Sequence, residues 1–265
     1  MDNKQTIVAN VYTDGSGIGQ VRKDFTQDTW EAGITLQLNN LTTIPPFQSS
    51  KAVVDALSRS GRATLIVPTQ PYATTTEPVE STEWLKRSSN WKDATRTDAP
   101  PLYCADGPVE NRDRTGTPLP LGGQKGSGRG SDTVINFTPR DYIKTCALPG
   151  GRPDEVWLHE MVHALRMELG LNLCLGMDDG YDTVEEFYAI LIANIYRSES
   201  GYRDLRANHN GKQMLAAPLT DDGQFYKPWK DKIDSLIREM PPSLSNSIAA
   251  VPCAFNPIRR AKATE

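Results

Sequence analysis

The stretch VWLHEMVHALRMELG, residues 156–170, places two of the chain's three histidines four residues apart in an otherwise largely apolar segment. Residues at positions i and i+4 lie on one face of an α-helix, so His159 and His163 can direct both imidazoles toward one point. Pro153 suits the first turn of this helix, and Gly170 suits its end. The spacing therefore predicts a helix that carries a paired-imidazole site.

This histidine pair predicts a metal site. Neutral imidazoles are good zinc ligands, and two of them on one rigid helix lose little entropy when the ion binds. Burying them in an apolar helix without partners would cost free energy, which argues against chance placement. Glu160 would project beside the metal and take a proton from a water that zinc has made acidic. We therefore predict a Zn2+ site with His159 and His163 as ligands and Glu160 as the general base.

A catalytic zinc site has three protein ligands and one open position, so a third ligand is needed. The class H-E-x-x-H-x-x-G-x-x-H is excluded, because this chain has Leu169 where that class has a histidine. Carboxylates remain as candidates. They are Asp178 and Asp179 in the connection after the first helix, and Glu185 and Glu186 at the start of a second one.

Local helix chemistry favours one of the two glutamates. In a capping box, Thr183 would cap the second helix and Glu186 would reach back to its backbone, which leaves Glu185 free to bind metal. Asp182 could instead form the capping box with Glu185. Glu185 is therefore the predicted third ligand, with Glu186 and the two aspartates as alternatives.

The same residues carry a family resemblance. The segment VWLHEMVHAL matches the uncharged surroundings of H-E-x-x-H in zinc proteases, and with a downstream glutamate the chain resembles a gluzincin-type metallopeptidase. The segments HEMVHAL and TVEEFYAILIANIYRSESGYRDLR resemble the small zinc proteases that bacteria inject as effectors and, more distantly, the clostridial neurotoxin light chains. In those light chains the first glutamate of a Glu-Glu pair is the ligand, which implies Glu185. The resemblance covers residues 132–211.

The predicted fold class is α+β: a zincin-like metallopeptidase domain with a small mixed sheet packed on the H-E-x-x-H helix and a second ligand-bearing helix. Residues 1–130 are expected to be a mixed, loop-rich elaboration of this domain, 131–240 the catalytic core, and 241–265 a poorly ordered tail. Further elements are expected from periodicity and turn residues. They are β-rich runs at 6–12, 63–68 and 132–137 and helices at 50–61, 183–200 and 231–240.

Peptide hydrolysis also needs a donor for the negative charge that develops on the carbonyl oxygen. Tyr202 and Arg206 follow the second predicted helix and are the predicted donors, with Arg203 and His209 in the same segment as alternatives. For any one of them, a solvated loop is the simpler interpretation. The strand at 132–137 is a candidate edge for pairing with an extended substrate.

Composition excludes several classes of function. The 265 residues carry a net charge of −4, which gives no polybasic surface for nucleic acid. No stretch reaches the roughly 18–20 apolar residues of a membrane span, and the N-terminus has no signal-peptide pattern. The four cysteines include no C-x-x-C pair, and we expect them to be reduced thiols.

The predicted function is that of a zinc metalloendopeptidase acting on a protein or peptide. The resemblance implies a bacterial effector or toxin, made in the cytoplasm and delivered into a host or rival cell by a specialised secretion system. An inhibitory or immunity partner is compatible with that context. The alternative is a non-enzymatic binding module with a structural zinc, for which Cys174 would be the fourth ligand.

Overall fold

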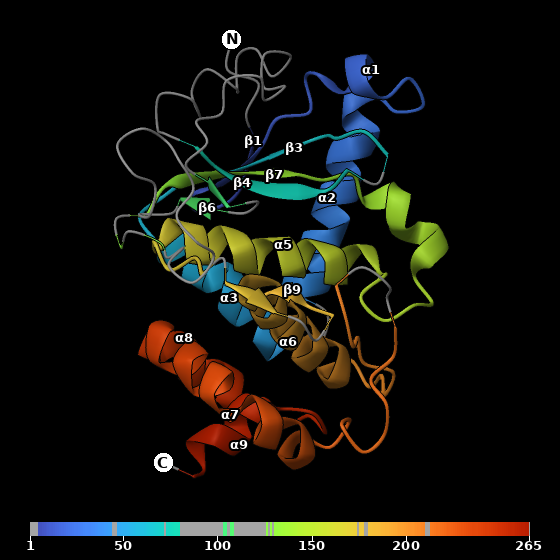
Figure 1. Cartoon of the computed structure of the whole chain (residues 1–265). Coiled ribbons are helices and arrows are strands. Elements are labelled where there is room, and N and C mark those ends of the chain that lie inside the picture. The colour runs from blue at the N-terminus through green and yellow to red at the C-terminus, as the bar shows by residue number, and fades with distance from the viewer. Residues whose placement is uncertain are drawn as a thin grey trace.

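A computed structural model of the chain shows one mixed sheet lying over a group of helices (Figure 1). The structure describes residues 5–43, 47–71, 73–79, 103–104, 107–108, 126, 128, 130–173, 175–177, 180–209 and 213–264. Its helices are α1 (Ile18–Val21), α2 (Gln27–Thr42), α3 (Gln48–Arg59), α5 (Pro153–Glu168), α6 (Val184–Glu199), α7 (Asp222–Glu239), α8 (Pro242–Ala249), α9 (Pro257–Lys262) and the 3-10 helix η3 (Pro139–Thr145). The predicted α+β class is confirmed.

The sheet has the strand order β1-β2-β3-β7-β4. Its strands are β1 (Gln5–Val8), β2 (Val11–Thr13), β3 (Thr64–Val67), β4 (Thr75–Val79) and β7 (Asp132–Asn136). The strands β2, β3 and β7 run parallel, whereas β1 and β4 are antiparallel to their neighbours. Two short hairpins lie outside it, β5 (Tyr103–Cys104) with β6 (Gly107–Pro108) and β8 (Gly176–Met177) with β9 (Asp182–Thr183).

Two strand predictions need correction. The run 6–12 is divided into β1 and β2 by a turn at Asn10, which has φ of +62°. The strand at 132–137 was a candidate edge for substrate, but β7 lies between β3 and β4 and both its sides are paired. Among the described strands, β4 lies at the end of the sheet next to β7, and β1 lies at the other end. Strand β4 contains Pro78, which cannot donate to a sheet ladder and is typical of edge strands.

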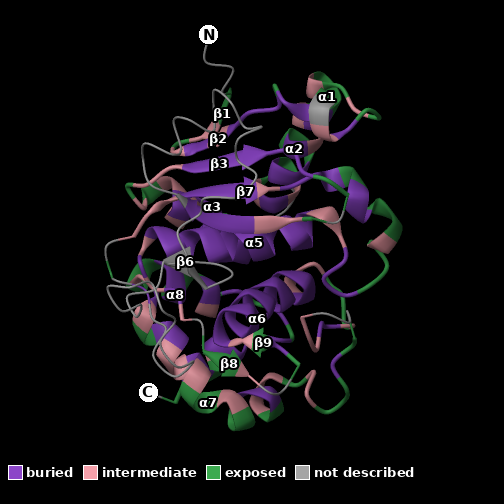
Figure 2. Ribbon diagram, turned by 45° about the horizontal axis from the view of Figure 1, so that its top comes forward, coloured by how far each residue is buried: buried purple, intermediate pink, exposed green. Residues whose placement is uncertain are grey.

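The helix α5 lies in the centre of the molecule. Every residue from Asp154 to Glu168 is buried, and α5 packs against the sheet, α2, α3 and α6 (Figure 2). The helix ends at Glu168, and Gly170, the stop residue that the sequence predicts, follows the cap residue Leu169 with φ of +67°. Because α5 has no exposed face, each of its charged side chains must be satisfied inside the protein.

The expected poorly ordered tail is instead part of the folded core. Residues 241–264 form α8 and α9, and their apolar side chains pack into the main hydrophobic cluster. Leu244, Ile248, Phe255 and Ile258 are each at most 5% exposed. These apolar side chains are separated by Pro, Ser and Asn residues, and that composition is typical of a poorly ordered segment.

Among the residues that the structure describes, Cys146 and Cys253 are free thiols. In the same part of the chain, no helix combines the length and the apolar character needed to cross a membrane.

A buried carboxylate ties the end of α5 to the sheet. Glu168 is 3% exposed and accepts hydrogen bonds from the hydroxyls of Thr64 on β3, at 2.5 Å, and Thr133 on β7, at 3.1 Å. Burial raises the pKa of Glu168 to about 7, because the hydroxyl donors Ser60, Thr64 and Thr133 only partly compensate for the lost hydration of its charge.

This raised pKa predicts a pH-dependent stability. Between about pH 4.5 and 7 the folded state holds a proton on Glu168 that the unfolded state has released, so stability falls as the pH rises through this range. The loss should amount to about 2–4 kcal/mol in the free energy of unfolding above pH 7. Denaturant unfolding of Glu168→Gln should show a flatter pH profile than the wild type. An unchanged profile in this variant would contradict the assignment.

Candidate metal centre

The two histidines of α5 converge as their spacing predicts. His159 and His163 are 5% and 2% exposed, and their Nε2 atoms lie 3.1 Å apart. Their rings meet edge to face, with centroids 4.7 Å apart. Both Nε2 atoms therefore face one small volume beside the helix.

A carboxylate from α6 completes this arrangement. The oxygens of Glu186 lie 3.0 Å from His159 Nε2 and 3.4 Å from His163 Nε2. Tetrahedral zinc, with ligand atoms at about 2.0–2.2 Å, requires ligand separations of about 3.3 Å, so all three separations suit a shared ion. Despite its close imidazole neighbours, Glu186 Oε2 accepts no hydrogen bond of good geometry from the described residues. A cation between these groups would satisfy it.

The protonation states also suit metal binding. Burial lowers the pKa of His159 to about 3, so its ring is neutral at physiological pH. Burial alone would raise the pKa of Glu186, but its contacts with His163 and His159 hold it well below its usual range. A neutral imidazole and an ionised carboxylate are the forms that bind zinc.

The geometry places Glu185, the predicted third ligand, against Arg166 rather than at the histidines. The Glu185 carboxylate receives hydrogen bonds from Arg166 Nε at 2.7 Å and Nη2 at 2.8 Å, and from the backbone N–H of Leu173 at 2.6 Å. Glu185 is 1% exposed and Arg166 is 3% exposed, so this is a fully buried ion pair. Its carboxylate is occupied with the arginine of α5.

Of the predicted capping box at the start of α6, the structure has the Thr183 cap but not the return contact from Glu186. Thr183 does cap α6, since its hydroxyl accepts the backbone N–H of Glu186 at 3.2 Å. The Glu186 side chain, however, faces the histidines. The sequence did contain a sign that one of the two glutamates has another partner. Arg166 lies in a largely apolar helix, and a buried arginine requires a carboxylate. Adjacent helical residues point about 100° apart, so only one glutamate can meet Arg166 and the other is left for the histidines.

Glu160, the predicted general base, follows His159 on α5. It is 8% exposed, and the hydroxyl of Thr76 donates to its Oε2 at 2.6 Å. Thr76 is fully buried on β4, so the edge strand of the sheet fixes the orientation of the Glu160 carboxylate.

The third histidine also reaches the site. The Nε2 of His209 lies 3.2 Å from Glu186 Oε2, and its ring is parallel to that of His159 with centroids 6.1 Å apart. The Nδ1 of His209 lies 2.6 Å from the carboxylate of Asp182 on β9. One ligand atom each from His159, Glu186 and His209 falls within 4.8 Å of the others. Of the alternatives in this segment, His209 is thus the one at the histidine pair.

The two predicted donors lie in different places. Arg206 is 7% exposed, and its charge acts on both His159 and Glu186. Tyr202 is 40% exposed, accepts from Arg152 at 2.6 Å and stacks on Arg197. The guanidinium of Arg206 donates to the backbone carbonyl of His209, whereas Tyr202 contacts Arg152 and Arg197 instead.

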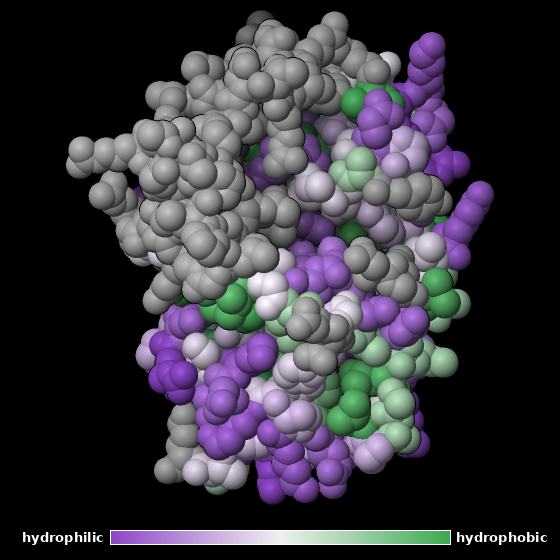
Figure 3. All heavy atoms as spheres, viewed as in Figure 1, coloured by the Kyte–Doolittle hydropathy of each residue, from purple (hydrophilic) through white to green (hydrophobic). Residues whose placement is uncertain are grey.

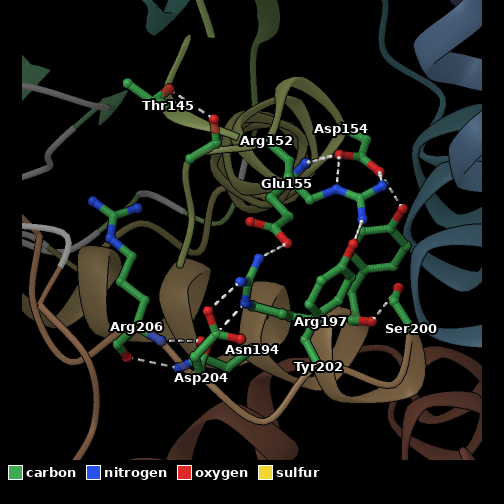
Figure 4. Close-up of polar contacts among 12 residues, drawn as sticks. Thr145, Arg152, Asp154, Glu155, Asn194, Arg197, Ser200, Tyr202, Asp204 and Arg206 are labelled. Carbon is green, nitrogen blue, oxygen red and sulfur yellow. Dashed lines mark hydrogen bonds and ion pairs between the residues drawn. The ribbon is translucent and has the colours of Figure 1, made fainter. Parts of the chain in front are cut away.

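Figure 4 shows what Tyr202 belongs to instead. A polar network joins the start of α5 to the end of α6, with Arg197 bonded to Glu155 at 2.5 Å and to Asp204 at 2.6 Å. Asp154 accepts from Tyr196 and is paired with Arg152 in the same network. This network is structural, since it fixes the two site-bearing helices at one end.

The remaining candidates cannot be placed. Asp178 and Asp179, the alternative ligands, and Cys174, the proposed fourth ligand of a structural zinc, lie outside the described residues. Comparison of the chain with protein-family models, with known proteins and with solved structures gives no match.

The two adjacent glutamates provide a matched test of the site. We expect Glu186→Gln to lower zinc affinity sharply, because a charged ligand is lost, while the fold is retained. Glu185→Gln should keep zinc but reduce the free energy of unfolding by about 3–5 kcal/mol, because it leaves Arg166 charged and buried. Zinc content by mass spectrometry and denaturant unfolding measure both effects. Loss of zinc in the folded Glu185→Gln variant alone would return the ligand to Glu185.

Proposed function

We propose that this protein is a zinc-dependent endopeptidase in which His159, His163 and Glu186 hold the metal. The observation that carries the proposal is the convergence of two imidazole nitrogens and one carboxylate, 3.0 to 3.4 Å from each other, beside a buried glutamate. One atom of this cluster, Glu186 Oε2, accepts no hydrogen bond of good geometry from the described residues, and a cation between the three side chains would give it a partner. A bound zinc would polarise the scissile carbonyl and lower the pKa of a water molecule.

Glu160 would act as the general base in this reaction. It follows His159 directly on the same helix, and Thr76 orients its carboxylate through the 2.6 Å hydrogen bond. Glu160 would accept the proton of the attacking water and pass it to the leaving amine. A binding site without chemistry has no need of a carboxylate held in this position.

The edge strand β4 supports a peptide as the substrate. Thr76 contacts the base, so a peptide paired with β4 in extended form would pass close to Glu160. Hydrophobic residues also gather on the lower right of the face drawn in Figure 3, over the segment that follows α6. That segment exposes Met214, Ala216 and Ala217, which suit apolar substrate side chains. The context of a delivered bacterial effector or toxin, with or without an immunity partner, rests on the resemblance of the H-E-x-x-H region alone.

A second candidate follows from His209. With Nδ1 donating to Asp182, a neutral His209 ring turns the lone pair of Nε2 toward Glu186, which is favourable with a cation between them. If His209 is a fourth ligand, the site is a closed structural zinc centre and the protein is a binding module. If His209 is protonated, it is a donor that can stabilise negative charge on the substrate carbonyl.

Removal of the base tests the peptidase proposal. We expect Glu160→Gln to keep the fold and one zinc per chain but to lower peptide hydrolysis by at least about 10²–10⁴-fold, because proton transfer is lost. The readout is cleavage of a degenerate peptide library by mass spectrometry, together with zinc content. The exposed Asp28→Asn variant on α2 is the control and should match the wild type. Equal cleavage by Glu160→Gln and the wild type would refute the role of Glu160.

Replacing the third histidine separates the two candidates. In a peptidase with His209 as donor, His209→Ala should retain zinc and lose about 10–10³-fold in turnover. In a closed structural site, the same variant should lose zinc affinity, and no variant should hydrolyse peptides. Zinc affinity and library cleavage of the same preparation decide between these outcomes.

A further inference from the structure

The described residues include four buried arginines, and one of them differs from the rest. Arg22, Arg166 and Arg197 are each paired with two carboxylates at 2.5 to 3.0 Å. Arg206 is only 7% exposed, yet no carboxylate of the described residues lies within ion-pair distance of it. A buried arginine without a directly paired carboxylate is costly, and such groups are found more often at functional sites than elsewhere.

The Arg206 side chain is held in one orientation. Its Nε donates to the carbonyl of Asn208 at 2.7 Å, and its Nη2 donates to the carbonyl of His209. Its backbone is fixed on both sides by Asn194, which donates to the carbonyl and accepts from the N–H, each at 2.8 Å. The guanidinium is therefore preorganised, and Nη1 makes no hydrogen bond to any residue that the structure describes.

The loop before α5 leaves room for this side chain. Gly150 has φ of +69°, and a Cβ at this position would lie 2.5 Å from Cδ of Arg206. In Figure 4 the guanidinium stands apart from the Arg197 network, on the opposite side of the drawn region from Tyr202. Burial lowers the pKa of Arg206, and the opposing charges that act on it most are those of Glu186 and Glu160. The geometric link to the candidate metal centre is His209, whose carbonyl accepts from Arg206 Nη2 and whose Nε2 lies 3.2 Å from Glu186 Oε2.

From this arrangement we infer that Arg206 is a subsite for a carboxylate of the substrate, next to the scissile bond. The inference rests on the proposed peptidase function and names its substrate class. Two donors of the guanidinium are held by carbonyls, and the other end of its planar fork suits the two oxygens of a carboxylate. A permanent negative charge would offset the desolvation of the cation in the resting complex, whereas a reacting carbonyl carries charge only briefly. The carboxylate belongs either to an Asp or Glu side chain or to the C-terminus of a peptide.

A binding experiment tests this subsite without turnover. Succinate and its uncharged analogue succinamide are titrated by calorimetry into the zinc-loaded wild type, Arg206→Gln, Arg206→Lys and Arg203→Gln. Arg203 is exposed three residues earlier and serves as the matched control. We expect succinate alone to bind the wild type, with affinity reduced about 10- to 100-fold in Arg206→Gln, less in Arg206→Lys and not at all in Arg203→Gln.

Several results would overturn the assignment: no binding of succinate to the wild type, equal affinity for succinamide, or unchanged affinity in Arg206→Gln. If Arg206→Gln does not fold, Arg206→Lys decides, since loss of the fork should still weaken succinate binding. Absence of any peptide cleavage would instead refute the peptidase proposal and leave the succinate result to stand by itself.

Peptide libraries then identify the source of the carboxylate. One library lacks Asp and Glu, and a second has amidated C-termini. Cleavage that depends on acidic side chains identifies an endopeptidase with an acidic preference, and cleavage that depends on the free terminus identifies a carboxypeptidase-like action. Cleavage that is indifferent to both would contradict a carboxylate subsite.

Discussion

The packing of α5 against α6 is the constraint on which the candidate site depends. Glu155 of α5 pairs with Arg197 of α6, and Arg166 of α5 pairs with Glu185 of α6, so the two helices run antiparallel. These two buried ion pairs lie on either side of His159 and His163 along α5. A buried ion pair tolerates little displacement, because a separated buried charge costs several kcal/mol. The pairs therefore fix both the register and the rotation of α6 relative to the histidines.

This rotation explains the different roles of two adjacent glutamates. On a helix, Glu185 and Glu186 point in directions about 100° apart, so one of them faces Arg166 and the other faces the histidine pair. The first carboxylate compensates a buried cation and accepts the N–H of Leu173. The second remains without a well-formed hydrogen bond to Oε2 from the described residues. Two arginines differ in the same way. Arg197 is paired with carboxylates and holds the helices together, whereas Arg206 has no carboxylate partner in the described part of the chain.

The sheet contributes orientation as well as burial. Glu168 binds β3 and β7 at the end of α5, and Thr76 of β4 holds the carboxylate of Glu160 near its middle. The helix that carries the histidines is thus fixed by polar contacts on the sheet side as well as on the α6 side. Contacts of this kind from surrounding residues keep the side chains of a functional site in a fixed geometry.

The sequence by itself determined the α+β class, the helix with both histidines on one face and the position of Glu160, and it favoured the cap at Thr183. These features follow from local spacing, since helical periodicity and capping act over three or four residues. Only the tertiary structure decided that Glu186 rather than Glu185 meets the histidines, that His209 returns to the site and Tyr202 does not, and that residues 241–264 belong to the core. Each of these depends on a contact between residues far apart in the sequence. The choice between the glutamates, for example, was made by the need of Arg166 for a buried counter-charge, which no local pattern around residue 185 contains.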